Sequence, residues 1–276
     1  MINAVGNRMT REIARQQKLA DALERTQIQI SGGKKLLRMS DDPVAARRIA
    51  TIGTTQASMA AWSANINSAT ALVSQADGVM KSVSNLMTRA RELTLAAASD
   101  TANPADRATI AAELGTIAAE LDALAATRDS NGEPVFAAGP ARVMRFDSDV
   151  SFAPVPSATD VFVVGGNSLS TNIRDAAAAV AANDKAGINA SLGVLDTTIS
   201  HVADRHAELG LAGGRIDRIG DGLAARGITL KDERSDVEDT NLEEAIAQLH
   251  AQDLTLQAAQ AAFAKINRQT LFDILN

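Results

Sequence analysis

A helical pattern without an interior proline runs from Pro43 to about Ser99, and it most limits the folds open to this 276-residue chain. Its apolar side chains recur every three or four residues and so form one stripe along a helix. At 1.5 Å per residue, a continuous helix of this length measures about 85 Å, whereas an average globular helix has about 11 to 12 residues. The pattern therefore indicates a rod or a coiled coil. The stripe comprises Val44, Ile49, Ile52, Met59, Ile66, Leu72, Val73, Val79, Val83, Leu86 and Leu93.

The composition also favours thin helical packing. Hydrophobic residues make up 46% of the chain, but aromatic residues make up only 3%, with one Trp and no Tyr. Much of the hydrophobic content is alanine, which buries little area per residue. Such a chain gains stability from many shallow helix contacts, so we expect long helices in a thin bundle.

The segment from Ser31 to Ala46 predicts a break between two helices. Its paired glycines can adopt backbone angles closed to other residues, so an incoming helix can end there. The paired aspartates that follow supply an acidic N-cap, and the next residue is a proline, which suits the first position of a helix. The predicted hinge and cap residues are Gly32, Gly33, Asp41, Asp42 and Pro43.

The N-terminal helix carries a diluted apolar stripe. Glu12, Gln16 and Thr26 occupy positions where the stripe expects apolar side chains. Because isolated helices are marginal in water, this helix needs a partner to keep its shape. The predicted contact residues on its stripe are Val5, Met9, Leu19, Leu23 and Ile30.

The last helix shows a seven-residue repeat. A capping box at residues 240–243 opens it, and Gln252 interrupts the repeat. Because both ends of the chain carry partly polar seams, we expect them to become ordered by packing against neighbouring molecules. The predicted contact residues on this helix are Leu242, Leu249, Leu256, Phe263 and Ile266.

Between the two ends, the pattern predicts a helical hairpin with a β-rich insert. Asn103 and Pro104 open a return helix after the turn at residues 99–107. The insert holds short β-leaning runs and four of the six phenylalanines, and a short helix follows it at residues 172–182. A long helical pattern then resumes from Ile188 to about Leu230, before a charged link at residues 231–239.

The predicted fold is therefore mainly α. We expect a long antiparallel helical hairpin, or coiled-coil rod, formed by the N- and C-terminal arms, with a small β-rich domain inserted at the middle of the chain and capping the far tip. The predicted domains are terminal assembly helices at 1–40 and 235–276, a helical rod at 41–128 and 172–234, and a β-rich tip domain at 129–171.

No pattern in the sequence predicts a catalytic, cofactor or metal site. The chain has no cysteine, and His201 and His206 are five residues apart, off one helical face. The glycines between residues 210 and 214 lie inside a helical pattern, which favours close helix packing over a phosphate loop. The Asp129–Glu133 segment is interpreted as a turn because its glycine stands too early for a calcium loop. We expect no enzyme activity, no cofactor and no metal.

Charge and hydropathy argue against two classes of partner. The net charge of −6 gives no reason to expect nucleic acid. No apolar run approaches the roughly 18 residues of a membrane span, and the N-terminus lacks the apolar segment of a secretory signal. We expect no nucleic-acid binding and no membrane insertion, and any route out of the cell would lack a Sec-type signal.

Several motifs together resemble one family. They are Ser31, Gly33 and Lys34 with SDDPVAA (40–46), RARELTLAAASDT (89–101), LAATRDSNGEPVFAAG (124–139), ELGLAGGRIDRI (208–219) and LQAAQAAFAKINRQTLFDIL (256–275). These residues resemble the flagellin superfamily, and within it the hook-associated protein 3 group of hook-filament junction proteins. Filament flagellins usually carry an ADDAAG-type segment without the proline of SDDPVAA.

The resemblance implies a structural subunit of the bacterial flagellum. It implies export in an unfolded state through the flagellar type III apparatus, an extracellular location, and polymerisation as a ring between hook and filament. The implied partners are further copies of the chain, the hook-side junction protein, flagellin and an export chaperone. The β-rich middle, residues 129–171, matches no motif of the group, so its contacts stay open.

Two alternatives remain at this stage. One is a short filament flagellin, which SDDPVAA and the ILN ending argue against. The other is a soluble enzyme or ligand-binding domain built on a helical bundle. A compact, protease-resistant monomer with ordered ends and a bound small molecule would favour the second alternative.

We predict that protease readily cuts residues 1 to about 40 and about 235 to 276 in the free monomer, because weak seams leave these arms ordered only on assembly. Limited proteolysis with mass spectrometry of the fragments measures this. Strong hydrogen-exchange protection of both arms in dilute solution would contradict the prediction.

Overall fold

The computed structural model describes residues 2–99 and 103–274, and side chains in 9–99 and 103–265. The chain divides into two compact units. We call Met1–Gln56 with Gly227–Asn276 the terminal unit, and Ala57–Arg226 the central unit. Two long helices, α2 (Pro43–Ala97) and α6 (Lys185–Glu238), contribute residues to both units.

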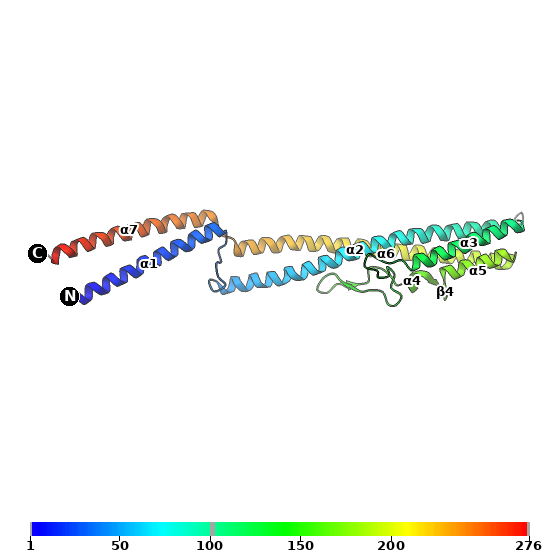
Figure 1. Cartoon of the computed structure of the whole chain (residues 1–276), viewed down its shortest axis with the longest axis horizontal. Helices are drawn as coiled ribbons and strands as arrows, with labels where there is room; N and C mark the ends of the chain where they lie inside the picture. Colours follow the sequence, from blue (N-terminus) through cyan, green and yellow to red (C-terminus); the bar gives the residue numbers. More distant parts are fainter. Residues whose placement is uncertain (1, 100–102, 275–276) are drawn as a thin grey trace. The chain divides into compact units, whose positions relative to one another are not determined.

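The described part of the chain is mainly helical, as predicted (Figure 1). Its strands are two residues long and form two antiparallel pairs, β1 with β2 and β3 with β4. Besides α2 and α6, the elements in chain order are α1 (Ile2–Gly32), α3 (Pro104–Ala125), β1 (Met144–Arg145), β2 (Ser151–Phe152), α4 (Ala158–Phe162), β3 (Val163–Val164), β4 (Asn167–Ser168), α5 (Leu169–Ala181) and α7 (Leu242–Ile274).

The predicted break between two helices is present. Helix α1 ends at Gly32, and Gly33 has a φ of +66°, in the left-handed region that favours glycine. Helix α2 begins at Pro43, and the Asp42 carboxylate accepts hydrogen bonds from the backbone N–H groups of Val44 (2.9 Å) and Ala45 (3.0 Å). Asp42 is thus an N-cap that satisfies two N–H groups lacking a partner within the helix.

Regular spacing of buried side chains organises α6 in the central unit. Its buried apolar residues recur every seven positions, which places them on one stripe that can pack along a neighbouring helix. Gly213 and Gly220 lie beside Val73 and Ile66 of α2, so the glycine-rich stretch serves close helix packing. The buried residues of the α6 stripe are Ile188, Leu195, Val202, Leu209, Ile216 and Leu223.

The insert at 129–171 packs along α2 and α6 in the central unit. Asn65 donates to the Arg145 carbonyl (2.8 Å), and Arg226 donates to the Asp147 carboxylate (2.5 Å). Phe136 and Phe162 meet edge to face with centroids 5.2 Å apart, and both belong to the main hydrophobic cluster. The predicted small β region at the middle of the chain is therefore present, and burial of these rings joins it to the central core.

Two helix boundaries differ from the predictions. The charged stretch at 231–239 is helical up to Glu238, because Arg234 and Glu238 pair one turn apart at 2.7 Å. The cap of α7 is Asn241 instead of Thr240, since the Asn241 side chain accepts from the N–H groups of Glu243 and Glu244.

We predict that Phe136→Ala destabilises the central unit by about 3 to 5 kcal/mol, because it empties a site that is 1% exposed. Urea unfolding followed by circular dichroism measures the loss. Leu211→Ala is the matched control, since Leu211 is 75% exposed and should change stability by less than about 0.5 kcal/mol. Equal effects of the two substitutions would contradict the assigned core.

Candidate assembly surface

Helices α1 and α7 lie side by side and antiparallel in the terminal unit (Figure 1). Gln16 donates to the carbonyl of Ala259 at 3.5 Å, and Thr26 lies 2.9 Å from the side-chain oxygen of Gln252. Within the chain, therefore, each arm has the partner that its diluted stripe requires.

Six of the ten predicted contact residues are half-buried where α1 and α7 lie side by side, and two are exposed. Met9 is 43% exposed, and Leu242 is 51% exposed because it lies beyond Gly32, where α1 ends. The side chains of Val5 and Ile266 lie outside the described residues. The half-buried ones are Leu19, Leu23, Ile30, Leu249, Leu256 and Phe263.

Polar residues sit inside this seam between α1 and α7. Thr26 is only 2% exposed, and its hydroxyl can donate to Gln252 or to the Ala22 carbonyl 3.0 Å away. The sequence marks both Thr26 and Gln252 as interruptions of an apolar stripe, and the structure brings them together. A buried polar pair in a helical seam fixes the register of the two helices, because sliding would leave polar groups without partners.

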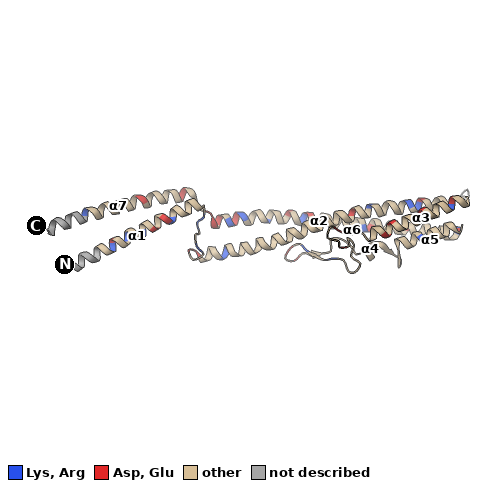
Figure 2. Cartoon of the chain, viewed as in Figure 1, with Lys and Arg blue, Asp and Glu red and all other residues tan. Residues whose placement is uncertain are grey.

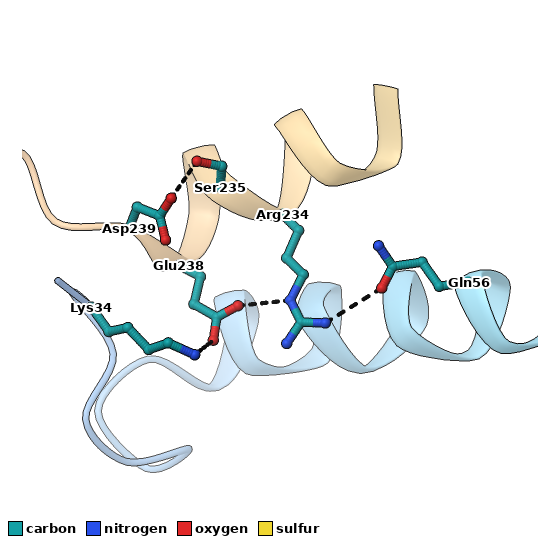
Figure 3. A network of polar contacts seen from close by, with 6 residues as sticks. All are labelled: Lys34, Gln56, Arg234, Ser235, Glu238 and Asp239. Carbon is teal, nitrogen blue, oxygen red and sulfur yellow. Dashed lines mark hydrogen bonds and ion pairs between the residues drawn. The ribbon is translucent and has the colours of Figure 1, made fainter. Parts of the chain in front are cut away.

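Beside this seam, a polar network links the segment between α1 and α2 to the segment between α6 and α7 (Figure 3). We call these two segments the joint. The Glu238 carboxylate accepts from Lys34 at 2.5 Å and from Arg234 at 2.7 Å, and Arg234 also donates to Gln56 at 3.4 Å. Ser235 donates to Asp239 one turn along α6. The network thus ties the segment after α1 to the end of α6 and to α2.

Main-chain bonds reinforce the same joint. The Lys35 N–H donates to the Glu238 carbonyl (2.8 Å), and the Thr240 N–H donates to the Gly33 carbonyl (2.9 Å). The two segments that connect the terminal helices to α2 and α6 therefore form a short antiparallel bridge. Sequence reasoning missed this pairing, because no local signal connects Lys34 with a residue 204 positions away.

Electrostatics favour the ionised form of Glu238. Hydrogen bonds from Arg234 first, and then from Lys34, hold the pKa of the Glu238 carboxyl below its ordinary value. The Glu238 side chain is 14% exposed, so water screens these contacts less than it screens a surface pair. Below the ordinary glutamate pKa of about 4, protonation removes this contribution.

The described residues hold no group of three or more His, Asp or Glu side chains that could bind a metal. His206 bonds to the Asp77 carboxylate at 2.7 Å, and His201 to the carbonyl of Asp160 at 2.8 Å. In the same part of the chain, no helix is both long and apolar enough to span a bilayer.

Long paired terminal helices, together with a central unit built on two long helices, define the class as a mainly α protein of coiled-coil type. Two family models match this chain: the bacterial flagellin N-terminal helical region at residues 3–139 and the C-terminal helical region at residues 192–275. The chain belongs to the bacterial flagellin family, as the sequence motifs predicted. It is accordingly a flagellar structural protein.

Solved structures share the fold. A putative flagellar hook-associated protein from Vibrio parahaemolyticus is 19% identical with a TM-score of 0.66, covering 72% of this chain and 100% of that one. Flagellar hook-associated protein-3 from Legionella pneumophila is 12% identical with a TM-score of 0.61, covering 68% and 99%. FlgL from Bacillus cereus is 16% identical with a TM-score of 0.55, covering 65% and 96%. Among curated proteins, none matches this chain.

We predict that Glu238→Gln loosens the joint at neutral pH. Amide exchange at residues 33–38 and 234–241 should quicken about fivefold, equivalent to about 1 kcal/mol, because a charged acceptor is lost. The folded-state pKa of Glu238 is lowered, so its contribution is present above pH about 4 and disappears in acid, where variant and native chain should converge.

Hydrogen exchange with mass spectrometry, corrected for intrinsic rates at each pH, measures this effect. The control is Glu120→Gln, an exposed glutamate of the central unit. A difference between variant and native chain that persists in acid would show that the charge of Glu238 is not responsible.

Proposed function

We propose that this chain is a junction subunit that joins the flagellar hook to the filament. It would be exported unfolded through the type III apparatus and would polymerise outside the cell as a ring. Its partners would be further copies of itself, the hook-side junction protein, flagellin and, before export, a chaperone. The role is structural, without catalysis, cofactor or metal.

The observation that carries this proposal is the way in which α2 begins after the joint. Asp42 caps α2 and Pro43 is its first residue, so SDDPVAA forms a defined helix start. Filament flagellins usually carry a different segment at this place, as noted for the sequence. The shared fold with proteins named hook-associated supports the same choice.

The terminal seam supports assembly as the function. Six of the ten predicted contact residues on α1 and α7 are half-buried in a seam that also contains Gln16, Thr26 and Gln252. Little apolar area is buried in such a seam, so exchanging the intrachain partner for one on a neighbouring molecule costs little. The absence of cysteine from the chain also suits passage through a channel as an unfolded polypeptide.

Deletion of the gene tests the junction role. We expect hooks to form while flagellin is secreted without attaching, and we expect the native gene to restore attached filaments. Immunogold labelling should give a single band where hook and filament meet. Labelling along the whole filament would instead identify a filament flagellin, and filaments attached normally in the deletion strain would refute the proposal.

A further inference from the structure

The two segments of the terminal unit carry opposite charge. Met1–Gln56 has ten Lys and Arg against five Asp and Glu, a net charge of +5. Gly227–Asn276 has four Lys and Arg against nine Asp and Glu, a net charge of −5. We call these segments the basic layer and the acidic layer. The opposite net charges of the two layers come from many residues and not from any single ion pair.

Some of this charge is used within the chain. Lys34 pairs with Glu238, and Arg48 pairs with Glu233. These two pairs engage two of the ten basic side chains of the basic layer. They hold the joint together.

The seam between α1 and α7 is formed mainly by uncharged side chains. Its half-buried and buried side chains include Leu23, Thr26, Leu249 and Gln252, which are uncharged. Figure 2 colours the charged residues along both helices, and among those whose side chains are described all are exposed except Glu12, which is half-buried. Exposed basic residues of the basic layer include Arg15, Lys18, Arg25, Lys35, Arg38 and Arg47, beside exposed Asp21, Glu24, Asp41 and Asp42. Exposed acidic residues of the acidic layer include Asp232, Asp236, Glu243, Glu244 and Asp253, beside exposed Lys231 and Lys265.

Helix geometry directs the charges of α6 away from α2. Glu233, Arg234 and Glu238 bond to Arg48, Gln56 and Lys34 and are half-buried. Asp232 and Asp236 are one turn apart and exposed, on the stripe opposite to those residues. The acidic layer thus presents these two carboxylates on its exposed side.

Exposed apolar side chains accompany the charge on both layers. Met39 and Val44 of the basic layer are 77% and 70% exposed, and Leu254 of the acidic layer is 69% exposed. Charge gives orientation and faster encounter, whereas buried apolar area gives persistence. Each layer therefore has both components of an interface.

We propose that the basic layer of one copy docks on the acidic layer of the next copy. The inference rests on the proposed self-assembly and identifies the surface that performs it. A two-fold contact through one layer alone would set like charges against each other. A contact in which only the basic layer of one copy meets the acidic layer of the next leaves one free layer of each kind on the pair, so that the contact repeats. A single exposed pair contributes little, so several pairs must act together.

The test uses charge reversal in the full chain. One variant carries Lys35→Glu and Arg38→Glu, and a second carries Asp236→Lys and Glu243→Lys. Association is measured by sedimentation velocity over a range of protein concentrations. We expect each variant alone to associate at least about tenfold more weakly than the native chain, because the two reversals lower the net charge of the altered layer from +5 to +1 or from −5 to −1 and set like charges against each other at the altered positions.

Mixing the two variants gives the decisive result. In an equimolar mixture each altered layer meets a complementary layer on the other variant, so association should return to within about threefold of the native level. An effect on folding of the single chain would not be rescued by mixing. Raising NaCl from about 50 mM to about 500 mM shortens the screening length about threefold and should weaken the native association.

Asp175→Lys with Asp204→Lys is the matched control, since both residues are exposed in the central unit and neither belongs to the two layers. Circular dichroism verifies that all variants retain their helices. The inference is overturned if the native chain stays monomeric at low salt, if its association is insensitive to salt, if either layer variant associates like the control, or if the mixture associates no better than its components. The outcome of the gene deletion does not depend on these association measurements, so a wrong junction role can be distinguished from a wrong interface.

Discussion

Burial of one narrow apolar stripe along each long helix is the constraint on which the central unit depends. On α6 the stripe places Ile188, Leu195 and Leu209 at full burial, seven or fourteen residues apart. With few aromatic side chains available, stability must come from many such contacts in register. The insert adds to the same cluster through Phe136 and Phe162, which explains why it lies along the helices.

Local chemistry made part of this architecture predictable. Gly33 at positive φ, the Asp42 cap and Pro43 at the first helical position act over a few residues, so the sequence locates the break between α1 and α2. The same holds for the start of α3, where Asn103 and Asp106 form a capping box behind Pro104. The apolar stripe of α1 and the seven-residue repeat of α7 predicted contact residues, and six of these ten residues are half-buried.

Contacts between residues far apart in the chain could not be predicted from the sequence. Lys34 and Glu238 are ordinary surface charges in their own segments and form a network only because the joint brings them together. The stretch at 231–239 looked like a link because it is highly charged, yet pairing of Arg234 with Glu238 keeps it helical. Thr26 and Gln252 each looked like a defect, and only their proximity makes them a matched pair.

The Thr26–Gln252 contact has a kinetic consequence. Separating two wholly apolar helices exposes a large apolar surface at once. In this seam, water can hydrate the polar side chains progressively as the helices separate. The arms can thus unzip stepwise, with a lower barrier and less tendency to aggregate than an all-leucine seam would have. Under the proposed assembly, such a seam would let an internal partner be exchanged for an external one on the timescale of helix fraying instead of global unfolding.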